Sequence, residues 1–194
     1  MDRSGGGQAP GVKVRQLVPR LAAEPLDRPE FPVLFTQHSG YVWTALRRLG
    51  VRTRDLEDLT HDVWVRVFRH LDDYDPSRPI KPWLFGFAFR VAAEDRRRLR
   101  RHPEDLVEPF DTPAAQPSPL EQVLAQERRE LAWAALEALE LGRRAVFILH
   151  ELDGCPIPEV AESLNIPLAT AYSRLRLARE DFDQAARRLA LRER

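Results

Sequence analysis

The sequence predicts an all-α protein with two small helical domains, an N-terminal helical bundle and a C-terminal helix-turn-helix domain, joined by a flexible linker. Apolar residues recur at helical spacing through residues 31–101 and again through 120–185. No segment of the first stretch alternates with the two-residue period of a strand. A proline-rich stretch at 103–119 separates the two patterns, so two helical packing units are expected.

Length and composition are those of a cytoplasmic protein without a membrane anchor. A chain of 194 residues that is 43% hydrophobic can form one domain or two small ones. No apolar run approaches the roughly 18 residues of a membrane span, and the N-terminus lacks a signal-peptide core. Cys155 is the single cysteine, which excludes an internal disulfide and fits a reducing compartment.

Charge is segregated along the chain although the net charge is zero. Basic residues gather at 90–101 and 174–194, and acidic residues gather at 55–62 and 104–130. A uniformly basic coat for nucleic acid is therefore excluded, whereas local basic faces remain.

The chain begins with an arm at residues 1–29 that is rich in Gly, Pro and Arg and is expected to be disordered. The first domain, residues 30–102, opens with a helix over 31–50 that Gly50 ends. A second helix follows over 55–71, with Asp55 or Thr53 as its N-cap.

The third helix, at 82–101, has an aromatic first half and an arginine-rich second half. Pro82 suits a first helical turn, and Trp83, Phe87 and Val91 recur on one face. Aromatic rings can hold unstacked bases and arginines can hold phosphates, so the helix suits single-stranded nucleic acid. A core helix with a solvated basic tail would carry the same pattern.

The segment at 103–119 holds five prolines and several acids, which predicts a flexible, extended linker or a plain spacer. The second domain, 120–194, begins with a helix over 120–140 that Gly142 interrupts. A short helix over 143–152 is expected next, ended by the turn at Asp153-Gly154.

The pattern of residues 156–185 is typical of a helix-turn-helix motif. Val160, Ala161 and Leu164 form the inner face of a short helix, and Asn165-Ile166-Pro167 turns the chain. The second helix runs from Leu168 to about Ala185, and in this motif such a helix presents polar residues to the major groove. Its outward candidates for DNA binding are Thr170, Tyr172, Ser173, Arg174, Arg176 and Arg179. A solvated helical hairpin is the alternative.

Both halves together resemble a bacterial RNA polymerase sigma factor of the extracytoplasmic-function (ECF) group. The stretches 58–75 (DLTHDVWVRVFRHLDDYD) and 82–92 (PWLFGFAFRVA) resemble the second sigma domain. The stretches 144–154 (RAVFILHELDG) and 159–167 (EVAESLNIP) resemble the fourth. The resemblance covers about 31–101 and 120–182, and the third sigma domain is absent, as is usual in the group.

The resemblance implies a factor that directs promoter recognition, −10 melting and transcription initiation. Its second helix would bind the clamp coiled coil of the largest polymerase subunit, through Asp58, His61, Asp62, Arg66 and Arg69. Its third helix would bind the −10 element, through Arg90, Glu94, Arg96, Arg97 and Arg98. Trp83 lies on the apolar stripe and is expected in the core.

The resemblance implies further partners as well. The C-terminal helix-turn-helix would read the −35 element, and the polymerase flap region and an anti-sigma factor are further expected partners. The polymerase would perform all catalysis, so no catalytic residue, metal or cofactor is expected in this chain.

Four positions depart from the family pattern. Many members have Asn where Arg90 stands, so Arg90 is expected to bind phosphate or to change the preferred base. Tyr172 and Leu177 stand where the family often has basic residues, and Ala169 where it has Gly or Asn. The −35 sequence therefore does not follow from relatives.

The sequence leaves two alternatives to a sigma factor open. A stand-alone helix-turn-helix regulator would bind duplex DNA without polymerase, but it does not need the acid-and-arginine surface at 58–69. An enzyme could use His61 with its neighbouring acids, or Cys155 with His150, yet neither set has the spacing of a known site. Few contacts are expected across the linker, so each half should unfold separately.

Overall fold

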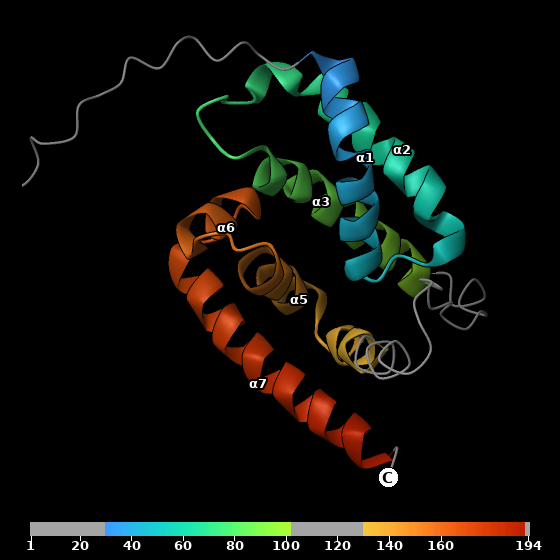
Figure 1. Cartoon of the computed structure of the whole chain (residues 1–194), viewed down its shortest axis with the longest axis vertical. Helices are drawn as coiled ribbons and strands as arrows, with labels where there is room; N and C mark the ends of the chain where they lie inside the picture. The colour runs from blue at the N-terminus through green and yellow to red at the C-terminus, as the bar shows by residue number, and fades with distance from the viewer. Residues whose placement is uncertain (1–29, 102–129, 193–194) are drawn as a thin grey trace, which may run out of the picture.

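A computed structural model describes residues 30–101 and 130–192, and its regular elements in these ranges are all helical. The long helices are α1 (Phe31–Arg48), α2 (Leu56–Arg69), α3 (Ile80–Arg101) and α7 (Leu168–Arg192). Two short helices, α5 (Leu141–Phe147) and α6 (Ile157–Ser163), lie between α3 and α7 (Figure 1). The predicted arm at 1–29, the predicted linker at 103–119 and residues 120–129 of the helix predicted over 120–140 lie outside the described residues.

The first half is a bundle of α1, α2 and α3, as the periodicity predicts. Each helix buries its apolar stripe against the other two, with Leu46 of α1, Val63 of α2 and Phe85 of α3 completely enclosed. Arg48 is the last residue of α1, and Gly50 follows with a φ of 91°, a backbone conformation that a glycine adopts without strain.

The start of α2 differs from the prediction. A short 3₁₀ turn at Thr53–Asp55 precedes the helix, and neither Asp55 nor Thr53 makes a capping hydrogen bond. The Asp55 carboxylate instead accepts a hydrogen bond from Arg52 Nε at 2.7 Å. The Asp55 carboxylate therefore pairs with the neighbouring arginine instead of capping the helix.

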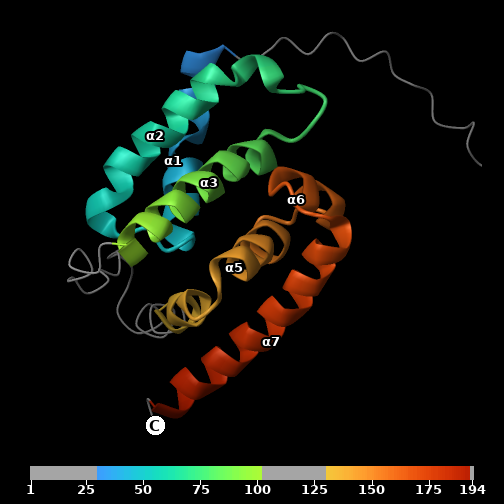
Figure 2. The ribbon, with the colours of Figure 1, turned by 180° about the vertical axis from the view of Figure 1, so that it is seen from behind.

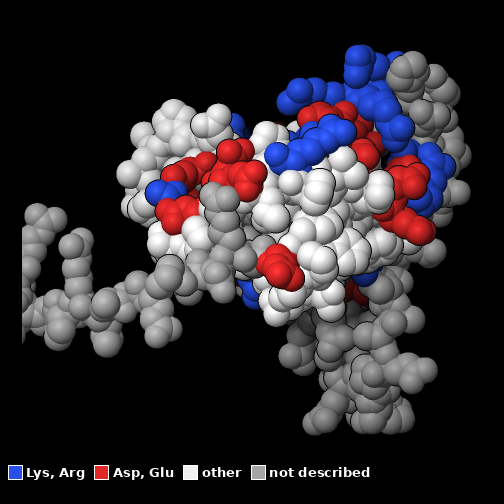
Figure 3. Space-filling model, turned by 90° about the horizontal axis from the view of Figure 1, so that it is seen from above, with Lys and Arg blue, Asp and Glu red and all other residues white. Residues whose placement is uncertain are grey.

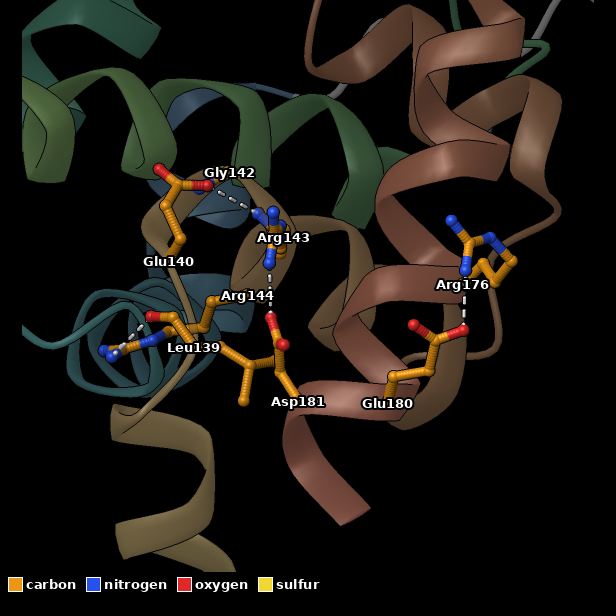
Figure 4. Close-up of polar contacts among 8 residues, drawn as sticks. All are labelled: Leu139, Glu140, Gly142, Arg143, Arg144, Arg176, Glu180 and Asp181. Carbon is orange, nitrogen blue, oxygen red and sulfur yellow. Dashed lines mark hydrogen bonds and ion pairs between the residues drawn. The ribbon is translucent and has the colours of Figure 1, made fainter. Parts of the chain in front are cut away.

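The second half contains helical residues 130–137, α5, α6 and α7. The predicted break lies at residues 138–140 rather than at Gly142, which belongs to the first turn of α5. Glu140 caps α5 by accepting hydrogen bonds from the backbone N–H groups of Gly142 and Arg143, at 2.9 and 3.2 Å (Figure 4). The short helix predicted over 143–152 is present as the end of α5 and a π-helical turn at Ile148–Leu152 that follows it directly.

The helix-turn-helix forms as predicted. Val160 and Ala161 of α6 pack against Ala171, Leu175 and Ala178 of α7, all of them buried. Asn165 turns the chain with a φ of 51°, a conformation that Asn tolerates better than most residues. The second helix is longer than predicted and continues to Arg192.

The two halves pack against one another, and the expectation of few contacts between them is wrong. The Asp153 carboxylate accepts hydrogen bonds from Tyr41 Oη at 2.8 Å and from Arg48 Nη1 at 3.1 Å, and both donors belong to α1. Helix α6 lies on α3, and one continuous apolar core includes residues of both halves (Figure 2).

Arg144 is the buried polar group of this contact, with 3% of its surface exposed. Its guanidinium donates to the carbonyl of Leu49 at 3.2 Å, in the first half, and to the carbonyls of Leu139 and Glu137, in the second. Burial lowers the pKa of Arg144 to about 10, so the group stays charged at neutral pH. A Cβ at Gly50 would clash with the Arg144 guanidinium, so a larger residue there would require this side chain to shift.

Candidate nucleic-acid interface

The outward face of α7 carries the residues predicted for −35 binding. Tyr172, Ser173, Arg176 and Arg179 are exposed, whereas Thr170 is half-buried. Tyr172 has 55% of its surface open near the start of the helix, where this motif contacts bases. The predicted exposure of these four side chains is confirmed, and their role in −35 binding stays a prediction.

Arg174 is only half exposed, because its guanidinium lies against the α5 backbone. A Cβ at Gly142 would come within 3.0 Å of Arg174 Nη1. The absence of a side chain at Gly142 thus leaves room for this arginine beside α5.

The two exposed arginines of the face have acidic partners within the second half. Arg176 Nη1 lies 2.6 Å from Glu180 Oε1, one turn further along α7 (Figure 4). Arg179 Nη2 lies 2.6 Å from Glu151 Oε1. Three of the four side chains are more than half exposed and Glu151 is 32% exposed, so phosphate can compete for the arginines at little cost.

The −10 candidates on α3 are arginines and one glutamate, Glu94, and these two groups differ in their partners. Arg97 and Arg98 are exposed, Arg96 is half-buried, and Arg98 Nη2 contacts the buried Asp95 carboxylate at 2.9 Å. Glu94 is held by Arg66 of α2 through two hydrogen bonds, at 2.9 and 2.6 Å. The hydrogen bond from Arg66 lowers the pKa of Glu94, so this carboxylate is charged and repels phosphate.

The polymerase candidates occupy one exposed face of α2. Asp58, His61, Asp62 and Arg69 are exposed, but Arg66 is half-buried and its guanidinium is committed to Glu94. Phe68 also lies on this side of the helix, two turns after His61, with 62% of its surface exposed. Sequence reasoning missed Phe68, although an aromatic residue off the apolar stripe was a signal for it.

A groove of about 560 Å³ lies between the loop before α3 and helix α6. Arg90 lines it and stands over the Phe87 ring, 4.4 Å from the ring centroid. Trp83 also lines it, half-buried and packed against Tyr74 and Phe87, so it is less enclosed than predicted.

Arg78 enters the same groove from the loop and forms an ion pair with Glu162 of α6. Sequence reasoning missed Arg78, because a pairing between residues 84 positions apart leaves no local pattern. Seen from above, basic side chains gather toward one end of the molecule with acidic ones among them, and a second acidic cluster lies toward the other end (Figure 3).

The side chains considered for an enzyme do not form a catalytic pair. His150 Nδ1 lies 2.8 Å from the backbone carbonyl of Cys155, not from its thiol. Burial raises the pKa of the Cys155 thiol to about 11, so it is protonated at neutral pH and a poor nucleophile. Within residues 30–101 and 130–192, no three His, Cys, Asp or Glu side chains form a group that could hold a metal ion.

Comparison with known proteins accounts for both halves. The family model of sigma-70 region 2 matches residues 34–102, and that of sigma-70 region 4 matches residues 129–182. The chain is 31% identical over 160 residues to the RNA polymerase sigma factor CnrH of Cupriavidus metallidurans, covering 77% of this chain and 82% of CnrH. The chain belongs to the ECF sigma factors. As a member of this group it is an alternative sigma factor, which directs promoter recognition and transcription initiation.

Another relative is the ECF RNA polymerase sigma factor SigE of Mycolicibacterium smegmatis, 32% identical over 157 residues. The match covers 79% of this chain but 60% of SigE. Among solved structures, CnrH in complex with the cytosolic domain of CnrY superimposes with a TM-score of 0.54 at 25% identity, over 79% of this sigma factor and 85% of CnrH.

The sigma factor RpoE of Bartonella quintana, solved with the anti-sigma factor NepR, has the same fold. Its TM-score is 0.63 at 20% identity, over 81% of this chain and 96% of RpoE. In the described part of this sigma factor, no helix combines the length and apolar character that crossing a membrane requires.

Proposed function

We propose that this sigma factor binds core RNA polymerase in the cytoplasm through the exposed face of α2. The face combines acidic and basic side chains with the exposed ring of Phe68. Protein interfaces favour such an aromatic anchor at the centre and charged groups at the rim. The partner surface is the clamp coiled coil of the largest polymerase subunit. Asp58, His61, Asp62 and Arg69 contact it, and Arg66 supports the face through its pair with Glu94.

The −10 element binds to α3 and the preceding loop. Arg90, Arg96, Arg97 and Arg98 supply positive charge for the phosphates, and the aromatic groove beside Arg90 supplies surfaces for unstacked bases. Glu94 does not contact phosphate, because it is negative and held by Arg66.

The −35 element binds to the outward face of α7, where Arg176 and Tyr172 are exposed and near the beginning of the helix. Each half therefore has a DNA-binding face of its own. The observation that carries this function is the presence, in one chain, of an aromatic groove with arginines and a helix-turn-helix.

An anti-sigma factor and the polymerase flap region are further proposed partners. CnrH has been solved with the cytosolic domain of CnrY, and RpoE with the anti-sigma factor NepR. The apolar depression around Trp133, Leu136 and Leu152 of the second half suits a partner helix, because Leu152 is 49% exposed there.

Run-off transcription with purified core RNA polymerase tests this function. Genomic fragments from the source organism serve as templates, including the region upstream of this gene. Transcripts that depend on this chain support the proposal. A footprint on duplex DNA without transcripts or a polymerase complex would instead indicate a stand-alone regulator.

A further inference from the structure

Four aromatic rings form a partly exposed cluster, here called the aromatic patch, where α1 begins and α2 ends (Figure 1). The centroid of the Phe31 ring lies 5.0 Å from that of Phe68 and 5.9 Å from that of Trp64. The Phe35 ring lies 5.1 Å from the Trp64 ring. Phe68 is 62% exposed and Phe35 is 44% exposed, so two of the four rings face outward from the bundle. Contiguous exposed apolar groups of this kind mark a docking surface.

The N-terminal arm, residues 1–29, joins α1 at the edge of the aromatic patch. Only Glu30 separates the arm from Phe31, the ring that contacts the other three. A chain can span up to about 3.5 Å per residue, so the stretch between Leu21 and Phe31 can extend over about 30 Å. Neighbouring rings of the patch are no more than 6.2 Å apart. The part of the arm before Leu21 can therefore reach the whole patch.

Residues 12–21 of the arm (VKVRQLVPRL) have the composition that such a surface needs. Residues 5–11 before them hold four glycines, whereas half of this segment is Val or Leu. A segment of this length cannot bury those side chains against a core of its own, so they lose contact with water only on another surface. The apolar surface nearest in the chain is the aromatic patch.

Charge favours the same contact. The charged residues of the segment are Lys13, Arg15 and Arg20, all of them basic. The exposed Asp72 and Asp73 follow Phe68 closely in the chain, and the exposed Glu30 precedes Phe31. Arg69 is basic, but the acids outnumber it at this end of the bundle. The segment and the edge of the patch therefore carry charges of opposite sign.

We infer that residues 12–21 bind the aromatic patch in the free chain and compete with core polymerase for Phe68. The competition rests on the proposed function, whereas the binding of the arm to the patch does not. Because the arm is tethered, its effective concentration at the patch is in the millimolar range, and a weak contact holds it there for much of the time. Polymerase contacts the charged residues of α2 as well as Phe68, and so displaces the arm.

Limited proteolysis of the full chain tests the contact without polymerase. Trypsin cleaves after Lys13, Arg15 and Arg20, and the cleavage rate follows the fraction of chains in which the segment is unbound. Phe35→Ser removes an exposed ring of the patch that is not a proposed polymerase contact, and Leu17→Ser removes an apolar side chain of the segment. If the arm is bound for half to four-fifths of the time, each variant should be cleaved about two- to fivefold faster, as measured by mass spectrometry.

The control is Leu168→Ser, which removes a side chain that is 47% exposed from α7 in the other half. Its arm should be cleaved at the rate of the original chain, and circular dichroism should show the same helix content in all variants. Cleavage of Phe35→Ser at the original rate would overturn the inference, as would equal acceleration in the control. A dimer of the original chain that Phe35→Ser dissociates, seen by analytical ultracentrifugation, would overturn it in favour of a second copy on the patch.

Binding to core polymerase tests the competition. Leu17→Ser should bind about two- to fivefold more tightly than the original chain, because the patch is then free in all molecules. Gln8→Ser changes the arm outside residues 12–21 and should bind like the original chain. Equal affinity of the two variants would overturn the competition. If none of the three chains binds polymerase, the proposed function fails, and the proteolysis still decides whether the arm binds the patch.

Discussion

The two proposed DNA-binding faces of this sigma factor differ in one contact of their arginines. On α7, Arg176 pairs with Glu180 and Arg179 with Glu151, so both partners belong to the same half. In the groove beside α3, Arg78 pairs with Asp75 of its own loop and also with Glu162 of the other half. The arginines of the α7 face therefore pair within their own half, whereas Arg78 also takes part in the contact between the halves.

The largest effect is expected from removing the buried guanidinium that joins the halves. Arg144→Ala leaves the carbonyls of Leu49 and Leu139 without their donor and should lower the free energy of unfolding by about 3 kcal/mol. Urea denaturation followed by circular dichroism measures this change.

The neighbouring residue provides a matched control. Arg143 Nη1 pairs with Asp181 at 2.6 Å, but both side chains are 35% exposed and both lie in the second half. Arg143→Ala should therefore cost less than about 1 kcal/mol after allowance for solvent screening. Equal losses in the two variants would show that Arg144 has no special role between the halves.

The open face of α7 predicts a loss confined to duplex DNA. Arg176→Ala should weaken binding to a −35 duplex by about 2 kcal/mol if the arginine reads a base, and leave single-stranded DNA binding unchanged. Competition between duplexes of different sequence measures the specificity. A loss that is uniform across sequences would instead identify Arg176 as a phosphate contact.

The pKa of the single cysteine, Cys155, depends on its burial and on charges from both halves. Cys155 is buried near two residues of the first half. The charge of Lys81 lowers the pKa of the Cys155 thiol, and the charge of the thiolate raises the pKa of Tyr41. Burial first, and then the charge of Asp153, raise the pKa of the thiol from 9.0 to about 11. Because the raised pKa belongs to the folded state, the thiol contributes full stability below about pH 9 and loses it as the pH rises toward 11.

The loss between these pH values should be about 2 kcal/mol, and Cys155→Ala should remove this part of the pH dependence. Urea titrations of both proteins from pH 8 upward measure it. At pH 8 the thiol should react slowly with iodoacetamide in the folded chain, because it is buried and protonated. A reaction as fast as that of a free cysteine would contradict the raised pKa.

Sequence patterns predicted the elements well and their assembly poorly. The apolar stripe of α2 and the buried Ala171, Leu175 and Ala178 of α7 follow from local periodicity, so the helices and the outward α7 face could be predicted. The contacts of Asp153 with Tyr41 and Arg48 join residues more than 100 positions apart. No local pattern encodes such a pairing, and a proline-rich segment between the halves suggested independence instead.

The sequence predicted which site residues are exposed where their exposure follows from their position on the helix. His61 and Asp62 lie off the stripe of α2 and are exposed as expected. Arg66 and Glu94 were assigned to different partners, but a bidentate contact across two helices joins them. A long side chain can reach a neighbouring helix, so its helical position alone does not tell whether its charge is available.

The smallest effect is expected at the rim of the α2 face. Asp62→Lys should weaken binding to core polymerase by about 1 kcal/mol, mostly through slower association, because Asp62 is an exposed charge. Folding should not change, and Asp183→Lys on α7 makes the same charge reversal in the other half. Surface plasmon resonance with immobilised core polymerase separates association from dissociation.

An unchanged association rate for Asp62→Lys would remove this part of α2 from the interface, while slower association in both variants would point to a general electrostatic effect. A loss specific to Asp62 that raised single-stranded DNA binding as well would mean that the α2 face and the −10 groove are coupled, through Arg66 and Glu94.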